Sequence, residues 1–153
     1  MNYKCPLIVV NDIAISREFY ETVLGQKVIL DFGANITFEG EFALQSKSSW
    51  AEFIDTTESD ISFASNNFEL YFEEEHFDDF VERLKIYPIK YVHDVKEFPW
   101  GQRVIRFYDP DMHIIEVGES MVTVVRRFLA QGLSVEETAK RTQHPVEFVR
   151  LCL

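Results

Sequence analysis

Two glutamates, Glu69 and Glu116, lie on apolar, strand-like segments in the second half of the 153-residue chain. Successive side chains of a strand point to opposite faces, so their apolar neighbours are expected to enter the core while both carboxylates share the other face. Two carboxylates in a partly apolar cleft either chelate a divalent cation or share a proton, because repulsion and desolvation raise the pKa of one of them. The pair therefore predicts a metal site or an acid–base pair.

The basic residues on the strand before Glu116 allow a simpler interpretation. Glu69 can form a salt bridge with Arg103 or Arg106 and have no chemical role. Arg106 itself can hold a substrate carboxylate or enolate through a bidentate contact, or it can pair with one of the many acids. Both alternatives remain open from the sequence.

Aromatic and histidine side chains complete the candidate site. Three aromatic residues are predicted to form a wall for a small apolar or aromatic ligand, with a purely structural role as the alternative: Tyr71, Trp100 and Tyr108. His93 alternates with apolar residues and could supply a metal ligand or contact a substrate, although a hydrogen-bonded structural role is favoured. His113 lies in the turn before the last strand and is not a strong candidate.

An internal repeat must position these residues. Each copy is predicted to consist of one strand, one helix and three further strands. In the first copy the segments are 4–10, a helix between Asp12 and Gly25, 27–31, 35–39 and 41–46. In the second copy they are 68–73, a helix from Phe77 to Leu84, 89–95, 103–108 and 113–118. The predicted fold class is α+β, with two βαβββ units that form a curved mixed sheet around a cleft.

The repeat also indicates which positions correspond. Alternation places Cys5 of the first copy at the position of Glu69, and Ala43 at the position of Glu116. A thiol is most simply a small buried apolar group here, since no base neighbours Cys5 in the sequence.

The chain resembles the vicinal oxygen chelate superfamily, which includes glyoxalase I, bleomycin-resistance proteins and extradiol dioxygenases. The resemblance is carried by residues 10–20 with Leu24-Gly25, and by residues 98–103 through Asp109-Pro110-Asp111 to Glu116. It covers residues 4–118 and is more specific for the fold than for the reaction.

The resemblance implies metal ligands at four positions, which are Cys5, Ala43, Glu69 and Glu116 in this sequence. Alanine cannot coordinate, and only Glu116 is the residue type usual in the family. The remaining set of Cys5, Glu69 and Glu116 implies a divalent metal such as Zn, Ni, Mn or Fe. Family turns commonly carry glycine where Met112 stands, so a reshaped turn is expected there.

The segment after the resemblance is predicted to be helical. We therefore divide the chain into a glyoxalase-like domain, residues 1–118, and a helical extension, residues 119–153. In the extension, Ser134 and Glu137 have capping-box spacing, and the helices resemble a helix-turn-helix unit. A helical cap or interaction module is favoured over DNA recognition, because the last helix carries few base-reading side chains.

Composition narrows the function classes. The net charge of −11 argues against nucleic-acid binding as the main role, and no apolar run is long enough to span a membrane. Cys5 and Cys152 lack metal-type spacing and are expected to be reduced thiols in a cytoplasmic protein.

Three functions follow in order of preference. The first is a glyoxalase-like small-molecule enzyme of lyase, isomerase or dioxygenase type, with a divalent metal in the cleft and Glu116 or Glu69 moving a proton. The second is a metal-free binding or resistance protein of the bleomycin-resistance type. The third is a regulatory protein whose tail contacts DNA or protein. We expect a homodimer that binds a small molecule.

Overall fold

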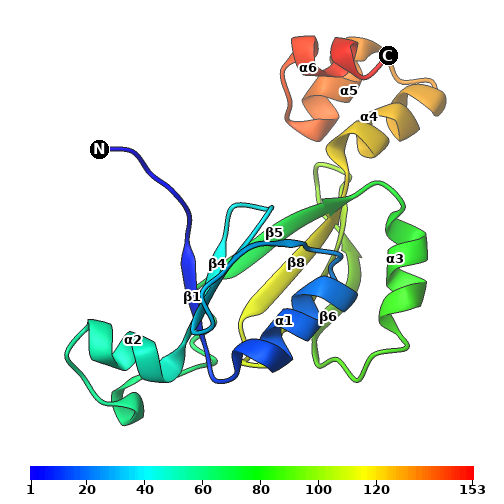
Figure 1. Ribbon diagram of the computed structural model, residues 1–153. Coiled ribbons are helices and arrows are strands. Elements are labelled where there is room, and N and C mark those ends of the chain that lie inside the picture. The colour runs from blue at the N-terminus through cyan, green and yellow to red at the C-terminus, as the bar shows by residue number, and fades with distance from the viewer. The chain divides into compact units, whose positions relative to one another are not determined.

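The computed structural model describes residues 1–153, and the chain forms two compact units. Unit 1 consists of Met1–Phe68 and Asp109–His113, and unit 2 consists of Glu69–Tyr108 and Ile114–Leu153. Each unit contains a four-stranded mixed sheet, and the strands follow the same order in both. Figure 1 shows the strands and helices along the chain. The α+β fold with two βαβββ units is therefore confirmed.

Unit 1 begins with a strand and a helix, and the three remaining strands follow. Its strands are β1 (Leu7–Val10), β2 (Val28–Asp31), β3 (Asn35–Phe38) and β4 (Ala43–Ser46), in the order β1-β4-β3-β2. Its helices are α1 (Ile13–Thr22), α2 (Lys47–Phe53) and the short 3₁₀ helix η1 (Glu58–Asp60). The pair β1–β4 is parallel, whereas β4–β3 and β3–β2 are antiparallel.

Unit 2 repeats this plan and adds three helices. Its strands are β5 (Glu69–Glu74), β6 (Tyr91–Glu97), β7 (Arg103–Tyr108) and β8 (Ile114–Glu119), in the order β5-β8-β7-β6. Its helices are α3 (Phe77–Leu84), α4 (Met121–Ala130), α5 (Val135–Thr142) and α6 (Val146–Leu151). None of the helices of the protein is both long and apolar enough to cross a membrane.

Alternating side chains build both cores. In unit 1, Tyr20 of α1 packs against Phe38 and Phe42, with ring centroids 5.6 and 5.3 Å away. In unit 2, the buried face of α3 covers the sheet, and Phe80 lies 6.3 Å from Phe107. On β7, the apolar residues Ile105 and Phe107 on either side of Arg106 are buried. The opposite face of this sheet carries the predicted site residues.

The turn Asp109–His113 is anchored within unit 1. Its Asp111 accepts hydrogen bonds from the backbone and side chain of Asn11, and Asp109 accepts one from the hydroxyl of Tyr20 at 3.0 Å. Burial, followed by the neighbouring Asp109 carboxylate, raises the pKa of Tyr20 well above its ordinary value. Met112 has a φ of 67°, the left-handed conformation that glycine favours, so the turn keeps the backbone expected of a glycine there.

The C-terminal helices gather at the end of β8 (Figure 1). Glu119, the last residue of β8, is 1% exposed and accepts hydrogen bonds from Arg103 of β7 and Arg127 of α4. Arg127 also donates to the carbonyl of Gly101 at 2.6 Å. These contacts join α4 to the sheet of unit 2. The predicted capping box of Ser134 and Glu137 is present at the start of α5.

Candidate functional site

Arg106 of β7 is the centre of the predicted site. Its Nε donates to Glu69 Oε2 at 3.0 Å, and its Nη2 forms an ion pair with Glu116. Nη1 lies 3.2 Å from Nε2 of His93. The strand register explains this convergence, because Arg106 lies directly opposite Glu116 on β8 and beside His93 on β6. Four of the predicted site residues are therefore brought together in unit 2.

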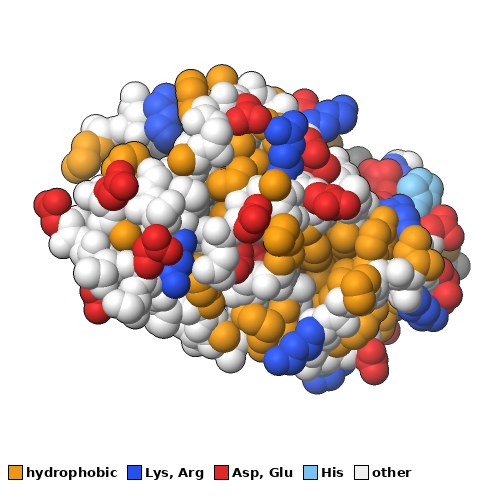
Figure 2. Space-filling model, turned by 60° about the horizontal axis from the view of Figure 1, so that its bottom comes forward, with side chains coloured by type: hydrophobic (Ala, Val, Ile, Leu, Met, Phe, Trp, Pro, Cys, Tyr) orange, Lys and Arg blue, Asp and Glu red, His pale blue; other side chains and the backbone are white.

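The cluster combines a buried carboxylate with a more exposed one. The side chain of Glu116 is 10% exposed, whereas that of Glu69 is 41% exposed. His93 Nδ1 lies 2.7 Å from the carbonyl oxygen of Asp94, so Nδ1 carries the proton and Nε2 accepts from Arg106. The two carboxylates and the one guanidinium sum to a charge of −1. Figure 2 shows acidic side chains scattered among hydrophobic ones on one face of the protein.

A hydrogen-bonded chain runs beside the cluster. Trp100 Nε1 donates to Gln102 Oε1 at 3.0 Å, and Gln102 Nε2 donates to the hydroxyl of Tyr71 at 2.7 Å. Tyr71 donates in turn to Glu73 at 2.8 Å and lies opposite Glu116 on β8. Burial is the main cause that raises the pKa of Tyr71 to about 12. The phenol therefore remains neutral at physiological pH.

The predicted aromatic wall is only partly assembled. Phe98 stacks on Trp100 with centroids 4.8 Å apart, and the guanidinium of Arg106 lies 5.4 Å from the Phe98 ring. Tyr108 lies at the end of β7, where Lys90 covers its ring at 5.4 Å. Trp100 also packs against the cluster of buried residues in α4. Tyr71 thus adjoins the cluster opposite Glu116, and Trp100 adjoins it through Phe98. Tyr108 has a different cationic neighbour.

Sequence reasoning gave no role to Gln102 and Phe98. Gln102 is 4% exposed and links two of the predicted aromatic residues, while Phe98 covers Arg106. Both lie in the Phe98-Pro99-Trp100-Gly101-Gln102 segment, which carried the family resemblance. That segment was the available signal, although residue types alone did not indicate which side chains would meet.

The donor set does not fit a divalent cation in the observed arrangement. Both Glu69 and Glu116 already face the guanidinium of Arg106, and the Nε2 lone pair of His93 accepts from the same group. No group of three or more His, Cys, Asp or Glu side chains is arranged to hold a metal ion. Cys5 belongs to unit 1, so the set of Cys5, Glu69 and Glu116 stays a prediction.

Comparison with known proteins identifies the fold family. The model of the glyoxalase-like domain matches residues 3–122. A structure of a protein of unknown function from Agrobacterium tumefaciens str. C58 is 39% identical, with a TM-score of 0.71, over 78% of this chain and 94% of the other. The chain therefore belongs to the glyoxalase-like domain family.

More distant structures share the fold. A glyoxalase/bleomycin resistance protein/dioxygenase from Nocardioides is 22% identical over 78% of this chain and 83% of its own, with a TM-score of 0.63. Lactoylglutathione lyase from Agrobacterium tumefaciens is 18% identical over 80% of this chain and 96% of its own, with a TM-score of 0.60. No curated protein sequence matches the chain significantly. Most of α4 and all of α5 and α6 lie beyond the residues that match the family.

Proposed function

We propose that the protein binds a small organic molecule without a divalent metal, in the manner of the bleomycin-resistance branch of its fold family, and that the cluster around Arg106 is the polar part of the binding site. One observation carries this proposal. The guanidinium of Arg106 pairs with both Glu69 and Glu116, the two carboxylates that would otherwise be available to a cation.

The charge of the cluster favours a cationic ligand. Glu116 is compensated by Arg106 in a buried position, whereas the partly exposed Glu69 retains acceptor oxygens for a ligand. Tyr71 is 48% exposed and offers an aromatic surface beside these acids. An organic ammonium group with an aromatic or apolar body satisfies both features, since cations bind to carboxylates and to ring faces. Binding should weaken as salt is added, because the charges are partly exposed.

Removing the arginine tests whether it stands in place of a metal. In wild-type protein, Mn²⁺, Ni²⁺ and Zn²⁺ are expected to leave the melting temperature unchanged. Arg106→Met leaves a buried carboxylate without its partner and should cost about 3 kcal/mol of unfolding free energy. The same variant should gain stabilisation by divalent cations, worth about 2.7 kcal/mol at a hundredfold excess over Kd. Thermal unfolding with and without each metal measures both effects.

Arg17→Met is the matched control. Arg17 also pairs with two carboxylates, those of Glu21 and Asp31, but its pairs are exposed. We expect neither a large loss of stability nor a metal response from this variant. If purified wild-type protein contains a stoichiometric divalent metal and its melting temperature rises with added metal, the metal-free proposal fails and the metal-dependent enzyme becomes the better explanation.

A cationic probe tests the ligand class. Benzyltrimethylammonium combines a fixed positive charge with one aromatic ring, and its binding can be followed by calorimetry. Glu69→Gln should weaken binding by up to about fivefold, as expected for a partly exposed ion pair. Glu82→Gln, which removes an exposed acid that pairs only with Lys85 on the surface, should have no effect. Equal losses in both variants would mean that the probe senses only the overall charge.

A further inference from the structure

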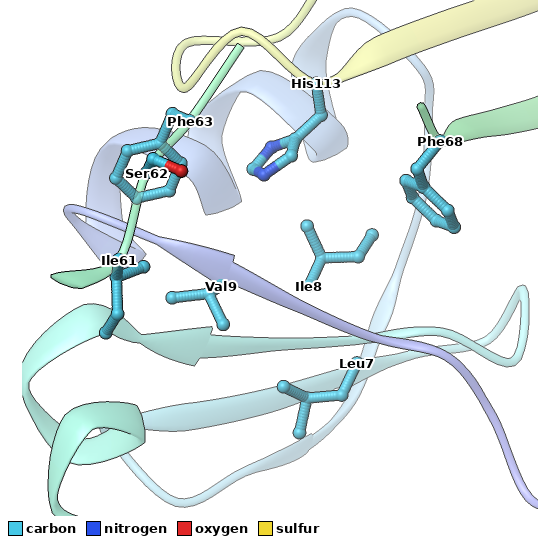
Figure 3. Close-up of a pocket in the computed structure, with 8 residues that line it drawn as sticks. All are labelled: Leu7, Ile8, Val9, Ile61, Ser62, Phe63, Phe68 and His113. Carbon is cyan, nitrogen blue, oxygen red and sulfur yellow. The ribbon is translucent and has the colours of Figure 1, made fainter. Parts of the chain in front are cut away.

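A cavity lies wholly within unit 1, and its lining includes no residue of the cluster around Arg106. Its volume is about 240 Å³, and it is lined by β1, by Ile61–Phe63 after η1, by Phe68 and by His113 (Figure 3). Apart from Ser62 and His113, the lining side chains are apolar. An apolar cavity of about 150 Å³ is large enough to bind benzene. The volume therefore suits one six-membered ring with small substituents.

Asp109 fixes the orientation and tautomer of the imidazole. The carboxylate of Asp109 is buried and accepts from the hydroxyl of Tyr20, from the backbone N–H groups of Asp111 and His113, and from His113 Nδ1 at 2.8 Å. A carboxylate that receives several N–H and O–H donors is an acceptor only, so Nδ1 must carry the proton. When the imidazole is neutral, the other ring nitrogen, Nε2, then presents a lone pair.

The lone pair of Nε2 has no partner within the protein. Figure 3 shows the ring of His113 projecting from its turn toward the space between Phe63 and Ile8. Phe63 contacts the imidazole edge-on, with centroids 5.8 Å apart, and helps to hold its plane. The cavity thus presents an open apolar lining with one oriented acceptor. Bound water can satisfy that acceptor, and a ligand with a suitable donor can replace the water.

We propose that this cavity is a second binding site, for a small aromatic molecule that carries one hydroxyl or N–H donor, which His113 Nε2 accepts. The site does not depend on the cluster around Arg106, because every lining residue and both partners of the Asp109–His113 pair belong to unit 1. The apolar lining supplies affinity, and the single acceptor orients the ring.

Phenol and toluene are matched probes for this site, since they differ only by a hydroxyl in place of a methyl group. One hydrogen bond to a neutral acceptor is worth about twofold to tenfold in affinity. His113→Phe should therefore lower the ratio of phenol to toluene affinity by about twofold to tenfold, and toluene binding should persist. The dissociation constants can be measured on the full chain by nuclear magnetic resonance titration.

Two further measurements keep the test independent of folding. His113→Asn retains a donor for Asp109 but lacks the distal nitrogen, so it should lower the same ratio, whereas Ser62→Ala should not. In wild-type protein, the ¹⁵N resonance of His113 Nε2 should move on addition of phenol and not of toluene.

The proposal is overturned if phenol leaves the Nε2 resonance in place, or if the affinity ratio is unchanged in both His113 variants. Arg106→Met serves to separate the two sites, because it should leave phenol binding intact. Loss of phenol binding in that variant would assign the phenol to the site in unit 2 and overturn the assignment to unit 1.

Discussion

The two sheets use one backbone plan for different side-chain chemistry. In both, a central strand pairs in parallel with the first strand of its unit and antiparallel with the third. One row of facing residues across the three strands reads Leu7, Ala43 and Thr37 in unit 1, and Tyr71, Glu116 and Arg106 in unit 2. A neutral row in one unit thus corresponds to a charged row in the other.

In unit 1, polar residues lie two positions further along β4 from Ala43 and form a neutral network. Asn35 donates to Gln45 at 2.9 Å, and Gln45 donates to Ser49 at 2.8 Å. Amides can satisfy each other when buried, whereas a buried carboxylate requires a cation or several hydrogen-bond donors. Ala43 removes that requirement from the row in unit 1, and Arg106 meets it in the row of unit 2. Of these two corresponding rows, only the row of unit 2 therefore offers charged groups to a ligand.

The largest expected effect on stability that distinguishes the two sheets lies at the ends of their central strands, β4 and β8. The position of Ser46 on β4 corresponds to Glu119 on β8, and a helix follows each strand almost at once. Ser46 caps its helix by accepting from the backbone of Ser49, while Glu119 is buried between Arg103 and Arg127. We expect Glu119→Gln to cost about 3–5 kcal/mol, because it removes one partner of a buried ion pair.

The matched change in unit 1 is Ser46→Ala, for which we expect a loss of about 1 kcal/mol. Urea unfolding of both variants measures the difference. The hydrogen bonds that Arg103 donates to Glu119 are the largest cause that raises the pKa of Arg103 above its ordinary value. An arginine is charged at neutral pH without this support, so the variant leaves the Arg103 guanidinium charged and without this partner. Equal losses of stability at the two positions would show that Glu119 is no more than a cap.

The turns between the second and third strands of each unit provide the next test. Gly101 has a φ of 88°, and a Cβ there would lie 2.3 Å from the ring of Phe128. Gly33, in the corresponding turn of unit 1, has a φ of 77° and open space around it. Gly101→Ala should cost about 2–4 kcal/mol, which combines overpacking with a left-handed backbone.

For Gly33→Ala only the backbone cost remains, about 1–2 kcal/mol. Thermal unfolding compares the two variants, and the double variant Gly101→Ala with Phe128→Ala separates the causes. If the clash with Phe128 contributes, the two substitutions will be less than additive. Strict additivity would mean that α4 does not pack on this turn.

Much of the fold could be predicted because its signals are local. Alternating apolar residues located the strands, and β7 was predicted with its observed bounds, Arg103–Tyr108. The spacing of Ser134 and Glu137 predicted the capping box because both partners lie within one helical turn. The correspondence of Ala43 with Glu116 followed from the repeat, since a period of two fixes the face of each strand residue.

The partners within the site could be predicted only in part. The sequence allowed Glu69 to pair with Arg103 or Arg106, and strand register decided for Arg106. The Asp109–His113 pair was missed, because its importance depends on a cavity that distant segments enclose. Local periodicity determines which face a side chain occupies, but contacts between distant segments determine its chemistry.

The first position of the row provides the smallest and most specific test, since Leu7 has no titratable group and Tyr71 has one. The pKa of Tyr71 in the folded protein is about 12, above the value of about 10 for an unfolded chain. The folded state therefore holds this proton more tightly, and the stability that it contributes is complete below about pH 10 and lost as the pH rises to about 12.

Burial is the largest cause of the raised pKa of Tyr71, and the acceptor Glu73 adds to it, so Glu73→Gln should lower this pKa while leaving it above the ordinary value. Phenolate absorbance measures the titration, with Tyr71→Phe identifying the step that belongs to this residue, and a midpoint unchanged by Glu73→Gln would refute the contribution of the carboxylate.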